Sequence, residues 1–508
     1  MNSMLFGTRA PFTLMVVSLI LFISVPSSLC SSLIQSYSKP VSGVPNDLIS
    51  RHSTVQINTH GSTDISLSSK QGLHQYQLGD TEVFSIDTKT NFSATCSLIG
   101  QDVYIFQDQR ISVSLSIEEI SNTITANITP LLNSYFGPIP DFDYNGRFIL
   151  VLTDLPSGLI AFFDPVDLTW SGFQGEIIYV DAYEFSYEAL VHELQHLLHF
   201  VADSFEEIWL NEGFSVYAEY LYRKDLSSSE LLEKIQYPQG TSLIYWDNSP
   251  NRVTSYDCVR GFMYYLMEKF GHTILRQIYY AEKAGVPLHG LESILYTLQE
   301  NSLHYSASEL FQEWQIAMHL GNSSNALNRT WLFDNFTVVP SLYVFPSDNF
   351  WGNDYPYQEH HSILPMASIS FYFHDFPDGN QINVILTSSK IDEKLSLNLS
   401  STLIKVYNNN EYIIEDYYLD QKGVLSINLN QTQDKFLGFY LVVYLSGLLE
   451  GGYLNDIPEI AKGINFELRI EAGQRDRIFL PIMLLALLGV VVMGFLAVKG
   501  TKRLMRVE

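Results

Sequence analysis

Two histidines four residues apart in a helical pattern constrain the fold of this chain more than any other feature. The segment 191–200 has the sequence VHELQHLLHF and holds His192, Glu193 and His196 in an HExxH arrangement. On a helix, residues i and i+4 project from one face about a turn apart, so both imidazoles can converge on one tetrahedral ion. Glu193 lies beside them, within reach of a water molecule at that ion. The segment therefore predicts a helix that carries two ligands and a general base of a zinc site.

A zinc hydrolase needs a third protein ligand and an open fourth position. The second helical segment, 207–220, has the sequence EIWLNEGFSVYAEY. Its Glu212 and Glu219 are seven residues apart and share one helix face. Either carboxylate could complete a His-His-Glu site, and the spacing alone leaves the choice open. His199, on the first helix, is expected to pack in the core or to support a ligand.

The combination of HELQH and WLNEG resembles the gluzincin metallopeptidases, in which the Glu of an NEG-type segment is the third zinc ligand. Residues 95–285 are similar to the hyicolysin-type family in particular, including the segments 141–147 and 171–181. The resemblance implies a zincin-like domain with Zn²⁺ held by His192, His196 and Glu212, and with Glu193 as general base. It also implies a tyrosine that stabilises the oxyanion. Tyr256 stands in a comparable place, although its interval to the next glycine is longer here.

These residues favour a zinc metalloendopeptidase that hydrolyses a protein or peptide substrate with a water activated by the metal and Glu193 as base. Aminopeptidase N-like relatives carry a Gly-Ala-Met-Glu-Asn segment that captures a free amine, and this chain has none. The segment 172–181 is the strand expected to offer its edge to a substrate backbone. The alternative is a catalytically inactive surface adhesin or receptor that keeps the fold and binds through a distal β-sandwich.

The order of sequence patterns predicts an α+β catalytic domain over residues 79–340. Alternating runs at 81–86 and 102–106 and apolar runs at 147–152 and 176–180 are typical of strands, and helical patterns dominate from 187 to about 320. Residues 31–70 are rich in Ser, Gly, Asn and Thr, and we expect the segment 31–78 to be a leader, linker or pro-segment. Short strand patterns at close intervals over 341–475 predict a β-sandwich domain.

The two apolar ends predict the topology. Residues 1–30 have the pattern of a signal peptide, cleaved near Cys30. Residues 478–498 contain no charged side chain and are long enough for a single C-terminal transmembrane helix, and the tail 499–508 is basic. We therefore expect a single-pass type I protein of the cell membrane with an extracellular catalytic domain. The net charge of −26, from 55 acidic and 29 basic residues, argues against nucleic acid as a partner. The oligomeric state stays open.

Three smaller features remain. The segment 141–146 opens like an EF-hand calcium loop, but Leu152 stands where the bidentate Glu would be, so a turn is expected. Cys96 and Cys258 could form a disulfide, which a domain of this size does not require. The pair His360 and His361 is a further candidate for a donor to the transition state.

Overall fold

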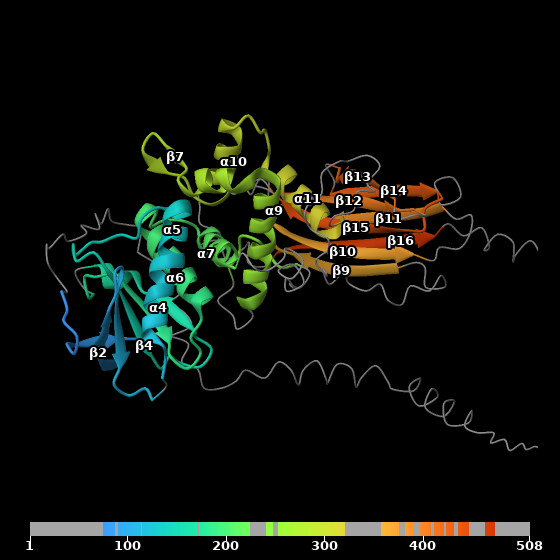
Figure 1. Cartoon of the computed structure of the whole chain (residues 1–508). Coiled ribbons are helices and arrows are strands. Elements are labelled where there is room, and N and C mark those ends of the chain that lie inside the picture. Colours follow the sequence, from blue (N-terminus) through green and yellow to red (C-terminus); the bar gives the residue numbers. More distant parts are fainter. Residues whose placement is uncertain are drawn as a thin grey trace, which may run out of the picture. The chain divides into compact units, whose positions relative to one another are not determined.

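The computed structural model of this protein describes thirteen stretches of the chain (Figure 1). They are residues 75–86, 90–112, 114–169, 172–223, 240–246, 252–320, 357–374, 381–389, 397–407, 411–420, 423–430, 435–446 and 463–472. The chain divides into two units, Met1–Arg51 and His52–Glu508, and every described residue belongs to the second.

A six-stranded mixed sheet forms the first part of the described chain. Its strands lie in the order β1-β2-β3-β4-β6-β5. They are β1 (Thr81–Ser85), β2 (Asn91–Ile99), β3 (Val103–Asp108), β4 (Phe148–Thr153), β5 (Ala161–Phe163) and β6 (Ile177–Asp181). Strand β4 is parallel to β3 and to β6, whereas the β1–β2, β2–β3 and β5–β6 pairs are antiparallel. Strand β5 is therefore an antiparallel edge strand beside β6.

Both faces of this sheet are covered, which explains the continuous apolar run of β4. Between β3 and β4 the chain crosses over through α4 (Ile117–Thr123), the π-helical turn η2 (Ile124–Ile128) and α5 (Thr129–Phe136). Alternate residues of the central strands enter one core with these helices and α6. The other residues meet aromatic rings on the opposite face, as Tyr179 does on Phe162 at a centroid distance of 4.5 Å.

Five helices follow the sheet within the described part of the chain. They are α6 (Tyr187–Ala202), α7 (Ile208–Tyr222), α9 (Arg252–Tyr279), α10 (Gly290–Glu300) and α11 (Ala307–Leu320), with the short hairpin β7 (Glu282–Lys283) and β8 (Val286–Pro287) before α10. Helix α6 begins at Ser186, whose side chain accepts a hydrogen bond from the backbone N–H of Ala189. A Cβ on Gly213 of α7 would lie 3.0 Å from Val259 and 3.2 Å from Met263. The glycine of the WLNEG segment thus lets α7 and α9 approach closely.

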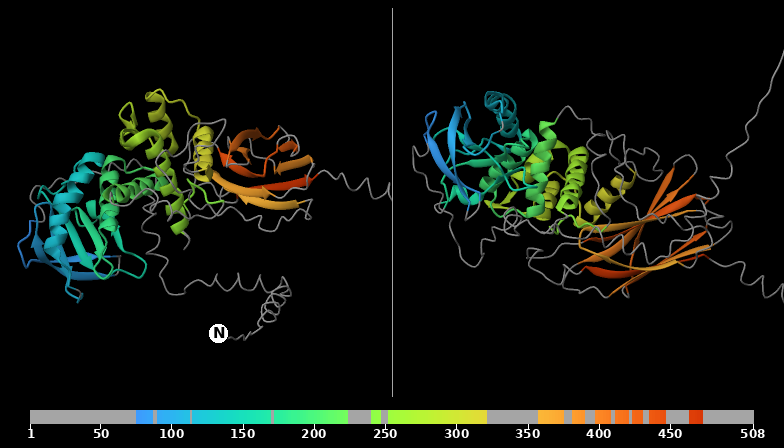
Figure 2. Two further views of the ribbon diagram at one scale, coloured as in Figure 1. Left: turned by 45° about the vertical axis from the view of Figure 1, so that its right-hand side comes forward. Right: turned by 90° about the horizontal axis from the view of Figure 1, so that it is seen from below.

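Two four-stranded antiparallel sheets form the last part of the described chain. Their orders are β10-β15-β12-β13 and β14-β11-β16-β9. The strands are β9 (Tyr357–Ile363), β10 (Ala367–His374), β11 (Gln381–Ser388), β12 (Asn398–Val406), β13 (Tyr412–Tyr418), β14 (Val424–Asn430), β15 (Gly438–Ser446) and β16 (Ile464–Ala472). The two sheets enclose one apolar core as a sandwich (Figure 2). On its other face β15 packs against α11, and the side-chain amide of Gln312 donates to Thr402 Oγ1 over 2.9 Å.

The predicted α+β class is wrong for the first part of the chain, which is mixed α/β. A helical crossover joins the parallel strands β3 and β4, so helices and strands alternate there instead of separating. The predicted substrate-binding edge at 172–181 is also wrong. Strand β6 lies between β4 and β5 and has no free edge, because it is paired with β4 on one side and with β5 on the other.

The prediction of a transmembrane helix is corrected as well. Among the described residues, the structure contains no helix that is both long enough and apolar enough to cross a membrane. The segments 1–30, 478–498 and 499–508, from which the signal, the span and the tail were predicted, lie outside the described residues, as do residues 31–74 of the predicted leader. The predicted single-pass type I membrane localisation is therefore not supported. The domain boundaries at 79–340 and 341–475 stay predictions.

Candidate metal centre

Helices α6 and α7 bring three of the predicted ligands together. His192 and His196 lie one turn apart on α6, and Glu212 faces them from α7. Glu212 Oε2 lies 3.2 Å from His192 Nε2 and 3.4 Å from His196 Nε2. One donor atom from each residue lies within 4.8 Å of the other two. The three side chains therefore form a group that can hold a metal ion.

The spacing of these donors fits a tetrahedral ion. Zinc binds imidazole nitrogen and carboxylate oxygen at about 2.0–2.2 Å, and the edges of such a tetrahedron are about 3.3–3.6 Å long. The two separations from Glu212 Oε2 are close to that length. Two histidines and one glutamate are also a donor set of catalytic zinc sites, which keep a fourth position open.

The second nitrogen of each histidine has a hydrogen-bond partner of its own. Nδ1 of His192 lies 2.7 Å from Glu219 Oε1, and Nδ1 of His196 lies 2.9 Å from Asn211 Oδ1. Because both partners offer an acceptor oxygen, each Nδ1 is placed to donate, and Nε2 is the nitrogen that faces Glu212 and would bind an ion. Glu219 Oε2 is in turn paired with the Arg260 guanidinium at 3.4 Å. The structure thus places Glu219 behind His192, outside the His192–His196–Glu212 group.

Glu193 is buried, with 5% of its surface exposed, and its carboxylate is held by the edge strand. The backbone N–H of Phe163 in β5 donates to Glu193 Oε2 over 3.0 Å. This bond connects the predicted general base to the free edge of the six-stranded sheet.

Tyr256 lies next to the metal group, near the start of α9. Its ring centroid is 6.1 Å from that of His192 and 5.0 Å from that of Trp246. The predicted oxyanion donor is therefore placed beside a ligand, although 64 residues separate the two in sequence.

The electrostatics of the group suit a cation. Burial by itself would raise the pKa of Glu212, but the charges and hydrogen bonds of His196 and His192 hold that pKa well below its usual range. Burial opposes the charging of His192, yet its bonds to Glu212 and Glu219 raise its pKa well above the usual value. Glu212 is therefore ionised at neutral pH and supplies negative charge where an ion would sit.

Two histidine candidates lie away from this group. His199 is buried on α6, where its ring packs against Tyr279 and Phe214 at centroid distances of 4.8 and 5.4 Å. His360 and His361 lie on β9, in a sheet of the sandwich, and not on an element that carries the metal group. Their predicted role as donors finds no support in that position.

The segment 141–146 forms a turn, as expected. Asp141 Oδ1 accepts from the backbone N–H of Asn145 at 2.9 Å and of Gly146 at 3.1 Å. Among the described residues, the loop acids do not belong to either group that could hold a metal. Cys96 and Cys258 are both buried and free, so the structure contains no disulfide between them.

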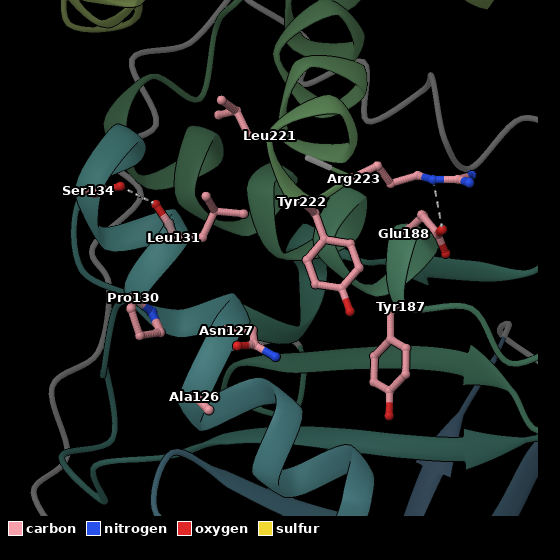
Figure 3. A pocket seen from close by; sticks show the side chains of 10 residues that line it. All are labelled: Ala126, Asn127, Pro130, Leu131, Ser134, Tyr187, Glu188, Leu221, Tyr222 and Arg223. Atoms are coloured by element: carbon pink, nitrogen blue, oxygen red, sulfur yellow. Dashed lines mark hydrogen bonds and ion pairs between the residues drawn. The ribbon is translucent and has the colours of Figure 1, made fainter. Parts of the chain in front are cut away.

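A pocket of about 680 Å³ lies where α6 begins and α7 ends. Its lining comes from η2, α5, α6 and α7 and includes the ion pair of Glu188 with Arg223 (Figure 3). This pocket shares no residue with the group of His192, His196 and Glu212.

Sequence reasoning missed three features of this centre. Asn211 directly precedes Glu212 in the WLNEG segment, and a polar side chain beside a candidate ligand is a signal for a hydrogen bond to another ligand, here to His196 Nδ1. Arg260 and the Phe163 N–H had no signal, because α9 and β5 are far away in sequence.

Comparison with known proteins gives one relative of interest. The chain is 22% identical over 244 residues to a neutral metalloprotease, ShpI, of Staphylococcus hyicus. The match covers 40% of this chain and 55% of the relative, so the chain spans about half of that protein's length. No family model matches the chain. The match gives general support for a metallopeptidase.

Solved structures add no argument. A structure of infectious bursal disease virus Gt strain is 12% identical over 25% of this chain and 35% of the other, with a TM-score of 0.14. A family GH115 4-O-methyl-α-glucuronidase, BtGH115A, is 9% identical over 64% of this chain and 51% of the other, also with a TM-score of 0.14. Both scores are too low to indicate a shared fold.

Proposed function

We propose that this protein is a zinc-dependent endopeptidase whose centre is His192, His196 and Glu212 on helices α6 and α7. The observation that carries the proposal is the tetrahedral spacing of these donors, 3.2 and 3.4 Å from Glu212 Oε2, with the Glu193 carboxylate on the same helix. The distant likeness to a neutral metalloprotease supports the same class of activity.

A zinc ion at this site would activate a water molecule and polarise the scissile carbonyl. Glu193 takes the proton of that water and passes it to the leaving amine. Its burial and the bond from the Phe163 N–H hold the carboxylate in one orientation for both transfers. Tyr256 is proposed to donate its phenolic hydrogen to the developing oxyanion, since its ring lies beside His192.

Strand β5 is the proposed support for the substrate backbone. It is an edge strand, and its Phe163 N–H points away from β6 towards Glu193. Backbone groups two residues apart on a strand face the same way, so Ala161 presents its groups to the same free edge. An extended peptide added there would pass the general base. Such an open edge accepts the interior of a chain, which favours endopeptidase activity over removal of single terminal residues.

The test compares the wild-type chain with Glu193→Gln on an unfolded protein substrate, with zinc content measured for both. We expect Glu193→Gln to retain zinc and to lose cleavage by about 10³-fold or more. Glu188→Gln, a half-exposed carboxylate one turn earlier on α6, is the matched control and should cleave normally. A wild-type chain that binds zinc without cleaving would favour the inactive binding protein. A wild-type chain that binds no metal would end the proposal.

Substrates with blocked and free N-termini test the endopeptidase assignment. Peptides with a blocked N-terminus should be cleaved at internal bonds, at rates similar to those of the same peptides with a free N-terminus. Cleavage confined to substrates with a free N-terminus would contradict it.

A further inference from the structure

A second group of donor side chains lies where α6 ends. Asp203 follows the last residue of α6, Glu206 lies in the loop to α7, and His289 directly precedes α10. One donor atom of each lies within 4.8 Å of the other two. His289 Nδ1 is 2.7 Å from Asp203 Oδ2. The two carboxylate side chains are 6% and 3% exposed, and His289 is 34% exposed, so the group lies at the edge of the core.

A buried imidazole nitrogen without a hydrogen-bond partner faces this group. The side chain of His199 is 1% exposed, and its Nε2 has no hydrogen bond. This nitrogen lies 3.7 Å from Glu206 Oε2, too far for a hydrogen bond between the two. A buried polar atom left without a partner costs free energy, so the position of this nitrogen beside the Glu206 carboxylate calls for a ligand between the two.

The carboxylates are oriented as metal ligands commonly are. Asp203 Oδ1 accepts from the backbone N–H of Phe205 at 3.0 Å. Glu206 Oε1 accepts from the backbone N–H of Gly290 at 2.8 Å and of Glu207 at 2.7 Å. Backbone bonds therefore hold one oxygen of each carboxylate, and the other oxygen, Oδ2 or Oε2, faces the histidines.

The local charge also requires compensation. Glu207 adds a third carboxylate beside them, which accepts a hydrogen bond from the indole N–H of Trp209. In the part of the chain that the structure describes, the ion pairs of Asp203 and Glu206 are made with His289 and His199 and not with a lysine or arginine. A divalent cation would balance these acids while both imidazoles remain neutral.

We propose that Asp203, Glu206 and His289, with His199 as fourth donor, form a second metal site that takes Zn²⁺. Two imidazole nitrogens and two carboxylate oxygens suit zinc, whereas calcium and magnesium prefer oxygen donors throughout. All four donors come from the protein, so the site is closed and structural. It joins the end of α6 to the start of α10, which lie 88 residues apart in sequence. It is separate from the centre proposed for catalysis.

Metal content of the full chain tests the proposal directly. After dialysis against a buffer whose only divalent metal is trace zinc, the wild type should hold two zinc ions per chain. His289→Ala should hold one, His192→Ala/His196→Ala should hold one, and the triple variant none. Glu292→Gln removes an exposed carboxylate from the first turn of α10 and should hold two. Circular dichroism reports whether each variant is folded.

Zinc titration of His192→Ala/His196→Ala gives a second measurement that does not depend on activity. Added ZnCl₂ should raise its Tm by about 2–4 °C, because an ion that binds only the folded state stabilises it. The same zinc should leave the Tm unchanged when Asp203→Asn is added to that background. Substituting His199→Leu there should weaken zinc binding by at least about tenfold.

Two results would overturn the second site. One is a wild-type chain that holds a single zinc ion, with the same content in His289→Ala. This result would mean that Asp203 and His289 form an ion pair and hold no metal. The other is a second ion that proves to be calcium. Failure of the catalytic proposal is distinguishable, since it would remove the ion bound by His192 and His196 and leave the ion that depends on His289.

Discussion

The middle and the end of α6 carry two groups of side chains that could hold a metal ion, and the two groups are built differently. The first group, His192, His196 and Glu212, comes from two packed helices, and each histidine has a hydrogen-bond partner on its second nitrogen. The second group comes from a helix end, a loop and the start of another helix. The first lies beside Tyr256 and on the same helix as Glu193, whereas the second is proposed to have four protein donors.

This difference teaches how one helix can serve two purposes. Rigid helical spacing orients the first group for chemistry, because a reacting geometry tolerates little displacement. The second group connects segments that α6 cannot reach by packing alone. We therefore expect substitutions in the first group to affect activity more than stability, and substitutions in the second group to do the reverse.

The largest effect should follow from His196→Ala. Loss of one ligand should release one zinc ion and lower the cleavage rate by at least about 10³-fold, while the Tm changes less than it does in His289→Ala. Initial rates on a quenched peptide and thermal unfolding of both variants measure this. Equal loss of activity in His289→Ala and His196→Ala would break the comparison between the two groups.

Glu176 is a buried carboxyl whose pKa is not lowered by an imidazole. Burial raises the pKa of Glu176 to about 8, and the backbone N–H of Phe142 bonds to its carboxyl. Its pKa is lower in the unfolded chain, near 4.5, so the folded state holds an extra proton between pH 4.5 and about 8. Stability from this carboxyl is present below pH 4.5 and is lost as pH rises through that window.

Glu176→Gln should remove that loss. We expect the stability of the variant relative to the wild type to rise by about 3 kcal/mol from pH 5 to pH 8. Urea unfolding at both pH values measures the gain, with Glu292→Gln as the exposed control. Parallel pH dependence in the wild type and Glu176→Gln would show that the carboxyl is not the titrating group.

A smaller effect is expected behind the first group. Glu219→Ala removes the partner of His192 Nδ1 and leaves Arg260 without that carboxylate. Zinc affinity should fall about 10–100-fold, and activity should recover at high zinc concentration. Competition with a fluorescent chelator gives the affinity, and Glu188→Ala is the control. Complete loss of activity that zinc does not restore would instead make Glu219 a direct ligand.

The smallest effect concerns the second group. A Cβ on Gly290 would lie 2.4 Å from the Glu207 carboxyl carbon, and the φ of Gly290 is +54°. Gly285, with φ of +78° and nothing within 4 Å, carries the same backbone strain without the contact. Gly290→Ala should therefore cost about 1 kcal/mol more than Gly285→Ala in thermal unfolding. Equal costs would mean that Glu207 moves aside freely.

Local periodicity explains what could be predicted. His192, Glu193 and His196 share one helix, and a spacing of four residues sets their common face wherever that helix packs. The apolar runs of β4 and β6 were recognisable because both faces of those strands are buried. Glu219 was found as a candidate but not in its role, since seven residues along α7 separate it from Glu212 and only packing decides which one faces the imidazoles.

Pairing between distant segments explains the rest. The short strand β5 has only three residues and gave no pattern, yet it takes the sheet edge that the sequence assigned to 172–181. Likewise, His199 and His289 are 90 residues apart, and neither has a motif around it.

The sequence by itself determined the two histidines of the first group and the helix that carries them, because hydrogen bonding within a helix places residues i and i+4 together without help from the rest of the chain. Only the tertiary structure decided that Glu212 faces the two histidines, that Glu219 and Asn211 stand behind them, and that a second group of donors meets at the end of α6. Those contacts depend on how α7 and α10 pack against α6, and packing is a property of the whole core.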